Sequence, residues 1–221
     1  LTFAEWGQSY IGQAATEYFL NPFTTGIFAC SSDELIASLA FPILIPESSD
    51  QSLIEHMRSL KKRKKRSGRP VMMSLENGMQ SLTDALANEL RGQIKLNTPV
   101  QSLESLSARG NVILATPANV TAKLLENADP ASSALLKQIR YTPLVSVTAF
   151  FDRSAFAHTP PRGVGFLVPK SQGHRVLGCL FNSSAFPNRA SENLVSLTIM
   201  LGGSVDPHAV ELSDSEIQNV I

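Results

Sequence analysis

The sequence contains few of the residues that build disulfide scaffolds, zinc sites or membrane spans. Its 221 residues include only two cysteines, Cys30 and Cys179, and neither belongs to a C-x-x-C pair. This excludes a disulfide scaffold, makes structural zinc improbable, and favours a reducing, cytoplasmic compartment. The best apolar run, Ala37–Ile45, is interrupted by Pro42 and falls short of the roughly 18 residues that a spanning helix needs. We therefore expect no membrane-spanning helix.

The sequence also has no excess of positive or negative charge, because 19 Lys and Arg residues balance 19 Asp and Glu residues. Within this balance, Lys61–Arg66 together with Arg69 forms a dense basic cluster. One reading is a contact with an anionic membrane surface, where each charge contributes about 1 kcal/mol. The other is a solvated loop between two helices. We expect no nucleic-acid partner, because no aromatic residue interrupts the cluster to stack on bases.

Standard motifs of hydrolytic, nucleotide-binding and metal-dependent enzymes are missing. The chain has no G-x-S-x-G elbow, no Walker loop and no H-E-x-x-H pair. Gly163 and Gly165 match the first two glycines of the G-x-G-x-x-G dinucleotide-binding motif, but Val168 stands where the third glycine belongs. We therefore predict no catalytic side chain and no metal ligand. The histidines are scattered: His56, His158, His174 and His208.

Residues 1–91 are predicted to be helical. Thr2 and Glu5 have the spacing of a capping box, and apolar residues from Phe3 to Phe19 recur at helical intervals until Asn21-Pro22 ends the helix. The capping pattern Ser31–Glu34 predicts a short helix that Pro42 stops. Further helices are expected from Ser49-Asp50 and over 78–90.

Residues 92–128 have a different pattern, typical of a small α/β segment. Ile94–Val100 reads as a short strand, and Val112–Ala115 as a buried one. A helix is expected from Thr116-Pro117 to Leu125. Another helix is predicted to begin at Asp129-Pro130, because proline at the first helical position needs no amide partner.

Residues 129–221 are predicted to contain one antiparallel sheet. Short loops join the four expected strands, which favours a meander over crossover connections. The strands are Leu144–Phe151, Gly163–Pro169, Arg175–Phe181 and Leu194–Leu201, and a last helix starts near Ser213. The predicted fold is α+β, with helices packed on an antiparallel sheet and a partial α/β segment, in domains 1–91, 92–128 and 129–221.

A binding surface fits these strands better than a catalytic centre does. Alternation places Val164, Phe166 and Val168 on one face of their strand, with Gly165 and Leu167 on the other. Small glycines beside large aliphatic residues can form the floor of a pocket for a broad apolar ligand. The spacing fits equally well a sheet whose two faces are both core.

Several blocks of the sequence resemble the central region of the oxygen-dependent protoporphyrinogen oxidases, within the flavin amine oxidase superfamily. The blocks occur in family order, and the last three are the most specific. They are Leu20–Ala29, Leu39–Pro42, Asn77–Leu82, Leu114–Ala118, Gly163–Pro169, Val176–Pro187 and Thr198–Gly203.

The resemblance implies an FAD enzyme of haem biosynthesis that oxidises a porphyrinogen to a porphyrin, with oxygen reoxidising the flavin. By the same resemblance, the backbone of Val100 approaches the adenine of FAD. Val164 departs from the family pattern, which often has phenylalanine there. A ring that could stack on the substrate is therefore replaced by a smaller aliphatic side chain. The positions that would line the substrate are Val164, Gly165, Leu167, Leu180 and Met200.

Family members open with a G-x-G-x-x-G unit and close with a second flavin-contacting segment, and neither pattern occurs here. We therefore expect a middle section that alone neither retains FAD nor turns over. The resemblance also implies peripheral membrane attachment and a homodimer. Alternatives are another flavin amine oxidase-like oxidoreductase or a non-catalytic porphyrin-binding module. The choice between protoporphyrinogen and coproporphyrinogen stays open.

Overall fold

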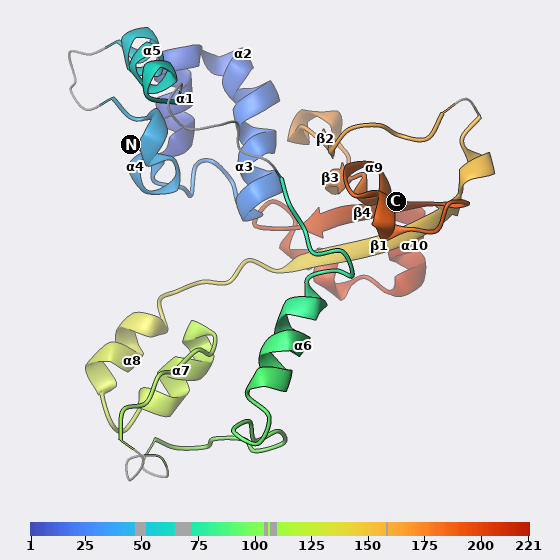
Figure 1. The fold of residues 1–221 in the computed structure, drawn as a ribbon. Coiled ribbons are helices and arrows are strands. Elements are labelled where there is room, and N and C mark those ends of the chain that lie inside the picture. Colours follow the sequence, from blue (N-terminus) through green and yellow to red (C-terminus); the bar gives the residue numbers. More distant parts are fainter. Residues whose placement is uncertain (47–51, 65–71, 104–105, 107–109, 158) are drawn as a thin grey trace. The chain divides into compact units, whose positions relative to one another are not determined.

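The chain forms two compact units (Figure 1). The computed structural model describes residues 1–46, 52–64, 72–103, 106, 110–157 and 159–221. The sheet unit comprises residues 1–79 and 142–221, and the hairpin unit comprises residues 80–141. The hairpin unit thus begins before and ends after the predicted segment 92–128. Within the described ranges, no helix combines the length and the apolar character needed to cross a bilayer.

The sheet unit opens with consecutive helical segments. Thr2 caps the first helix: its Oγ1 accepts from the Glu5 amide at 3.2 Å, while the Thr2 amide donates to Glu5 Oε2 at 2.9 Å. This confirms the predicted capping box. Gly12 then breaks the helix with a φ of 86°. The segments are α1 (Phe3–Ile11), α2 (Gln13–Ala15), a π-helical turn (Thr16–Leu20) and α3 (Asn21–Phe28).

The prediction that Asn21-Pro22 ends the helix is wrong. Pro22 lies in the first turn of α3, where its missing amide costs no hydrogen bond. The helical path therefore continues until Ala29, which has a left-handed φ of 53°. Residues Ser31–Glu34 form a turn rather than a helix start, and the short helix begins only at Ala37.

The remaining helical part of the sheet unit packs around an aromatic cluster. Phe41 lies with its ring centroid 4.5 Å from that of Phe3 and 5.4 Å from that of Phe23. Buried Phe3, Trp6 and Leu20 form the centre of this core. Ser49-Asp50, the predicted start of the next helix, lies outside the described residues. The segments here are α4 (Ala37–Ala40), a 3-10 turn (Pro42–Leu44) and α5 (Leu53–Lys64).

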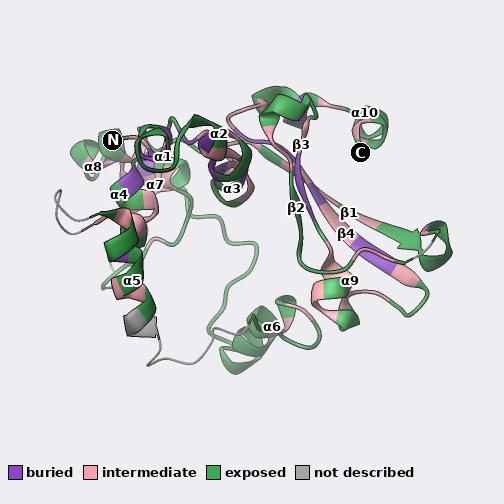
Figure 2. Cartoon of the chain, turned by 90° about the horizontal axis from the view of Figure 1, so that it is seen from above, coloured by how far each residue is buried: buried purple, intermediate pink, exposed green. Residues whose placement is uncertain are grey.

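A four-stranded antiparallel sheet completes the sheet unit, which confirms the α+β class. The strands are β1 (Leu144–Asp152), β2 (Gly165–Leu167), β3 (Val176–Leu180) and β4 (Leu194–Gly202). Their order is β1-β4-β3-β2, so only β2, β3 and β4 form a meander and β1 pairs with β4. The buried positions of the sheet lie mainly in β3 and β4 (Figure 2).

Short helical segments flank these strands. Cys179 is buried with Ile199, Leu201 and Ala209, as expected for a small core residue. Ser213 caps the last helix in a capping box with Glu216, as predicted. The segments are 3-10 turns at Arg153–Ala155, Lys170–Gln172, Pro187–Arg189 and Pro207–Glu211, with α9 (Asn182–Ala185) and α10 (Asp214–Val220).

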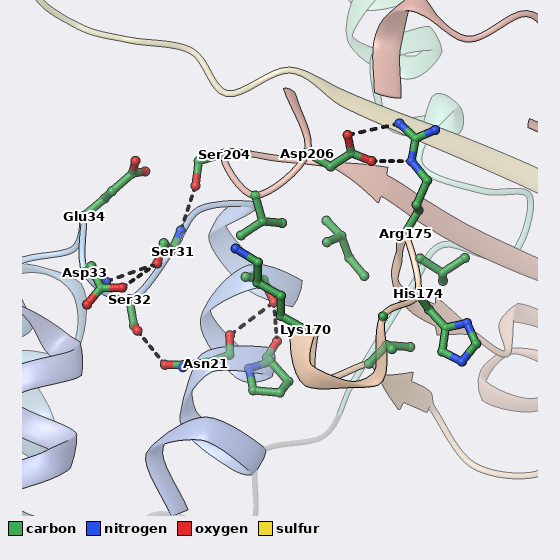
Figure 3. Close-up of a pocket in the computed structure, with 17 residues that line it drawn as sticks. Asn21, Ser31, Ser32, Asp33, Glu34, Lys170, His174, Arg175, Ser204 and Asp206 are labelled. Atoms are coloured by element: carbon green, nitrogen blue, oxygen red, sulfur yellow. Dashed lines mark hydrogen bonds and ion pairs between the residues drawn. The ribbon is translucent and has the colours of Figure 1, made fainter. Parts of the chain in front are cut away.

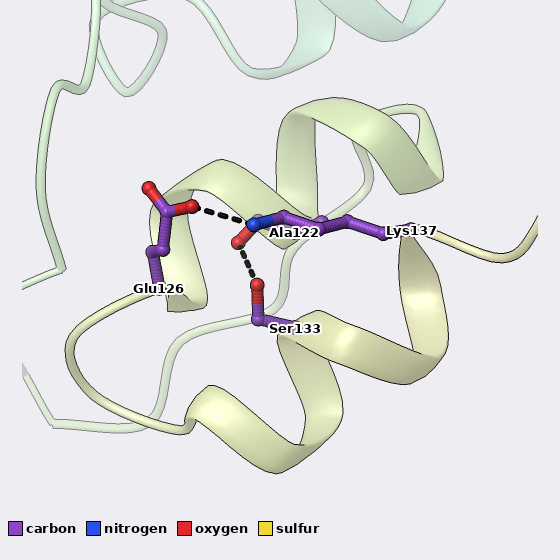
Figure 4. Close-up of polar contacts among 4 residues, drawn as sticks. All are labelled: Ala122, Glu126, Ser133 and Lys137. Carbon is purple, nitrogen blue, oxygen red and sulfur yellow. Dashed lines mark hydrogen bonds and ion pairs between the residues drawn. The ribbon is translucent and has the colours of Figure 1, made fainter.

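The hairpin unit contains α6 (Gln80–Glu89), α7 (Ala118–Leu125) and α8 (Pro130–Leu136). Asp129 caps α8, with its carboxylate accepting from the Ser132 amide at 3.0 Å. Helices α7 and α8 form a hairpin in which the buried Ser133 hydroxyl donates to the Ala122 carbonyl at 2.7 Å (Figure 4). The Lys137 amine lies 2.5 Å from Glu126 on the exposed side of this hairpin.

The two strands predicted in this unit do not form. Residues 94–100 and 112–115 have no regular secondary structure, and the Ile113 side chain is 92% exposed. A buried strand needs partners for its backbone hydrogen bonds. No described segment of the hairpin unit pairs with either run.

Candidate functional site

An apolar cavity of about 620 Å³ lies in the sheet unit, between the helical segments 16–28 and the sheet. This volume is typical of pockets for small organic ligands. One wall is helical and carries Tyr18, Phe19, Pro22, Phe23, Gly26 and Ile27. The opposite wall comes from the sheet and carries Val164, Gly165, Phe166, Leu167, Leu180 and Met200.

The sheet wall alternates small and large residues across neighbouring strands. Gly165 pairs with Leu180, and Leu167 pairs with Gly178, which in turn pairs with Met200. Each leucine therefore stands beside a glycine on the neighbouring strand, which lets the strands approach closely.

Backbone contacts make the glycines of this wall difficult to replace. A Cβ at Gly165, whose φ is 154°, would lie 2.1 Å from the Cys179 carbonyl oxygen. A Cβ at Gly178 would lie 2.7 Å from the Phe166 carbonyl oxygen. Both contacts are with backbone, which cannot rotate away as a side chain can.

The helical wall is held close to the sheet by a third glycine and by hydrogen bonds. A Cβ at Gly26 would lie 2.3 Å from Leu167 Cδ2, so a larger residue there would require the Leu167 side chain to move. Beyond α3, the Ser204 amide donates to the Ala29 carbonyl at 2.8 Å, and the Ser31 amide donates to Ser204 Oγ at 2.8 Å. The width of the cavity is thus set by contacts in the last turn of α3 and in the segment that follows it.

The chemistry of the cavity is that of a binding surface. Among its lining side chains, the Tyr18 phenol is the only ionisable group. Aromatic and aliphatic groups stand open to the cavity, with Phe19 76% and Val164 56% exposed. Such a wall can hold a flat apolar molecule and exclude water from it, but it offers no obvious proton donor or acceptor pair.

A second cavity, of about 550 Å³, is polar and lies at the turn joining β2 to β3 (Figure 3). Arg175 forms a bidentate ion pair with Asp206: Nε lies 2.7 Å from Oδ2 and Nη2 lies 3.0 Å from Oδ1. The hydrogen bond from Arg175 lowers the pKa of the Asp206 carboxyl. This pair connects the start of β3 to the loop after β4, which is a structural role.

The described residues supply only one candidate flavin contact. Val100 lies in the hairpin unit, in a segment without regular structure, and is partly exposed. Neither of the two strands predicted around it is formed within the described part of this unit. The described residues therefore do not by themselves make a flavin cradle. The described ranges also hold no group of three His, Cys, Asp or Glu side chains placed to bind a metal ion.

All five residues predicted to line a substrate pocket meet in the apolar cavity. Val164, Gly165, Leu167, Leu180 and Met200 are contributed by three strands and the residue before β2. Their contact with a substrate stays a prediction, as does the contact of Val100 with FAD.

The helical wall was not predicted. Phe19 was expected as the last apolar residue of the first helix, and in the structure it lines the cavity. A signal was present, because Phe19, Phe23 and Ile27 recur at intervals of four residues, which is one face of a helix. The expected break at Asn21-Pro22 divided this stripe.

Comparisons with known proteins identify similar chains across this whole region. The family model described as flavin containing amine oxidoreductase matches residues 2–221. The mitochondrial protoporphyrinogen oxidase of Nicotiana tabacum is 27% identical over 97% of this chain and 51% of its own length. The protoporphyrinogen oxidase of Homo sapiens is 30% identical over 92% of this chain and 48% of its own length.

A solved structure has a similar fold. The crystal structure of an Exiguobacterium sp. 255-15 protein, provisionally assigned as a protoporphyrinogen oxidase, matches with a TM-score of 0.76 and 22% identity. It covers 100% of this chain, which covers 49% of that protein. The chain thus spans about half the length of the relatives that it matches.

Proposed function

Because the chain belongs to the family of flavin containing amine oxidoreductases, we propose that it provides the porphyrinogen-binding surface of an FAD-dependent protoporphyrinogen oxidase. One observation carries the proposal: the five positions that the resemblance assigns to the substrate all line one apolar cavity. Residues scattered over 37 positions of sequence, from Val164 to Met200, would not gather by composition alone. The names of the matched relatives support the same substrate class.

The cavity suits a porphyrinogen because that molecule is wide, largely apolar and becomes flat on oxidation. Gly165, Leu180 and Met200 offer an apolar surface to the macrocycle. These residues would position the macrocycle and exclude water. FAD bound to the full-length protein would supply the chemistry that removes hydrogen from the substrate, and we propose oxygen as the final acceptor.

Binding is the first test, because it needs no flavin. Protoporphyrin IX, the stable aromatic product, should give a saturable shift of its Soret absorbance when titrated with the protein. Leu180→Trp would fill the cavity and should weaken binding at least tenfold. Phe150→Trp is the matched control, since Phe150 is an exposed aromatic residue of β1 that does not line the cavity. Equal binding by the wild type and Leu180→Trp would reject this site.

Turnover is the second test. The full-length gene product, supplied with FAD and oxygen, should produce porphyrin fluorescence from protoporphyrinogen or coproporphyrinogen faster than spontaneous oxidation does. The preferred substrate would decide between the two pathway branches. A flavin-loaded protein that oxidises amines and neither porphyrinogen would identify the alternative, an amine oxidase relative.

We also propose that α5 contacts an anionic membrane surface. Its buried side is anchored by His56, whose Nε2 donates to the Ile43 carbonyl at 2.9 Å. The opposite side exposes Ile54, Met57, Arg58 and Lys61 at helical spacing, beside an apolar groove of about 620 Å³. Apolar residues next to cations are the features by which a helix lies in a membrane interface. Lys65, Arg66 and Arg69 of the predicted basic cluster lie outside the described residues.

A further inference from the structure

The π-helical turn Thr16–Leu20 interrupts an otherwise α-helical path directly at the apolar cavity. Its hydrogen bond runs from the Asn21 amide to the Thr16 carbonyl, which is an i→i+5 pattern. Such turns are rare, and those that occur are frequently found at functional sites. The turn contains one residue more than an α-helical turn and therefore changes the direction in which its side chains point.

Two residues of the turn are anchored firmly in the core. Thr16 and Leu20 are 3% and 7% exposed. The Thr16 hydroxyl donates to the Gly12 carbonyl at 2.9 Å. Gly7 of α1 lets the turn approach, because a Cβ there would lie 2.7 Å from Thr16 Oγ1 and 3.0 Å from Leu20 Cδ1.

Of the three residues between these anchors, Tyr18 and Phe19 face the cavity. Tyr18 and Phe19 are consecutive in sequence, both are largely exposed, and both line the cavity opposite the sheet. Large exposed aromatic side chains beside an apolar cavity indicate a ligand surface. On the sheet side, Val164 offers only a small aliphatic side chain, and Phe166 is the aromatic residue among the described lining residues of that wall.

We propose that Tyr18 and Phe19 are specificity-determining residues that supply an aromatic contact to the tetrapyrrole from the helical wall. This inference rests on the proposed function. The π turn presents both rings to the cavity while Thr16 and Leu20 stay in the core. Stacking of an aromatic ring on a flat ligand changes affinity by about two- to tenfold per ring.

The test compares protoporphyrin IX affinity among variants of exposed residues. Phe19→Leu keeps an apolar side chain but removes the ring, and it should weaken binding about two- to tenfold. Phe19→Trp should preserve binding. Phe150→Leu removes an exposed ring outside the cavity and should leave binding unchanged. Circular dichroism would verify that each variant is folded.

A second substitution tests whether an aromatic side chain on the sheet wall can replace Phe19. Val164→Phe adds a ring to the sheet wall, so it should recover most of the affinity for protoporphyrin IX that Phe19→Leu loses. In the wild-type background the same substitution should gain less, because the helical wall already provides the stacking contact. A structural role of Phe19 would not produce this rescue.

The outcomes separate the two proposals. If the wild type binds, Leu180→Trp does not, and Phe19→Leu and Tyr18→Leu both bind like the wild type, then the pocket is confirmed and the aromatic wall is rejected. If wild-type binding is absent or insensitive to Leu180→Trp, then the proposed function fails and this inference fails with it. Weakening by Phe19→Leu together with rescue by Val164→Phe would establish the aromatic wall.

Discussion

Gly163 and Gly165 are two residues apart and both have positive φ, yet their surroundings differ. At Gly163, with φ of 102°, no atom lies within 4 Å of the position that a Cβ would occupy, whereas at Gly165 the Cys179 carbonyl oxygen lies 2.1 Å away. Gly163→Ala should therefore cost only the strain of the backbone, about 1–2 kcal/mol. Gly165→Ala should cost several kcal/mol more, because β2 must separate from β3.

Urea denaturation of both variants would measure this difference. Gly163→Ala serves as the matched control for the effect of alanine at positive φ. Equal losses of unfolding free energy at the two positions would contradict the close approach of β2 to β3.

The Arg175–Asp206 pair predicts a dependence of stability on pH. Arg175 lowers the pKa of Asp206 below its ordinary value of 3.8, so folding favours the charged carboxylate. The pair should therefore stabilise the fold above pH 3.8, and this contribution should disappear as the pH falls through the folded pKa. Asp206→Asn should have a lower free energy of unfolding than the wild type at neutral pH. This difference in free energy should shrink as the pH falls.

Urea denaturation of the wild type and Asp206→Asn, from neutral pH down to pH 3, would measure how this difference in free energy changes with pH. Asp152→Asn, at an exposed aspartate at the end of β1, is the matched control for the change of Asp to Asn. A difference that stays constant with pH would show that Asp206 acts through packing rather than through charge.

At the scale of elements, the α7–α8 hairpin contains one buried and one exposed polar contact. Ser133 is 1% exposed and donates to Ala122, while Lys137 and Glu126 meet in solvent (Figure 4). Ser133→Ala should lower the local stability of the hairpin by about 1 kcal/mol, because a buried hydrogen bond is lost. Lys137→Met should change it little, because solvent screens the exposed pair.

Hydrogen exchange at the amides of α7 and α8 would report this local stability without requiring the whole chain to unfold. Faster exchange in Lys137→Met than in Ser133→Ala would contradict the assignment of the buried hydroxyl as the stronger contact.

Gly7 does not line the apolar cavity, but it packs against the π turn that does. We therefore expect a substitution of Gly7 to affect ligand binding in the cavity. Gly7→Ala would push against Thr16 and Leu20, and such overpacking costs about 1–3 kcal/mol, partly offset by the higher helix propensity of alanine. The displaced turn should also weaken protoporphyrin IX binding. Ser9→Ala, on the exposed side of α1, should do neither. Unchanged urea midpoints and affinity in Gly7→Ala would contradict the tight packing of the turn.

Elements that depend on neighbouring residues were predictable from the sequence. The capping boxes at Thr2 and Ser213, the cap at Asp129 and the antiparallel strands all follow from short-range patterns. Elements that depend on distant partners were not. The run Ile94–Val100 has the composition of a strand, but no described segment of its unit supplies a pairing edge. Pro22 looked like a helix end because the π turn before it leaves no sequence signature.

For the molecule as a whole, membrane docking is the proposal most open to a direct test. The double variant Arg58→Gln/Lys61→Gln should bind vesicles of anionic lipid with roughly thirtyfold lower affinity, because each charge contributes about 1 kcal/mol. Sedimentation with the vesicles would measure this affinity. Ile54→Ser should weaken binding further, by removing apolar contact. Lys95→Gln with Lys123→Gln, an equal charge change in the hairpin unit, is the control.

Equal losses from the two double variants would show that only net charge matters and would reject a docking surface on α5. Binding should also fall as salt is raised, because exposed charges are screened.

The candidate site was predictable only in part, and for a physical reason. Alternation along one strand separated Gly165 and Leu167 from Val164, but it could not decide whether either face was core. The partners Leu180 and Met200 came from family resemblance, because register between strands is a tertiary property. The helical wall was missed because its position depends on contacts such as Gly26 with Leu167.

The two walls of the cavity differ in how freely they can evolve. At Gly165 and Gly178 any side chain would collide with backbone, so natural variation cannot reshape the sheet wall there without loss of the fold. Phe19 and Tyr18 are exposed and carry no such constraint. Lineages that acquire a new ligand preference should therefore accumulate their substitutions on the helical wall, while the two sheet glycines remain fixed.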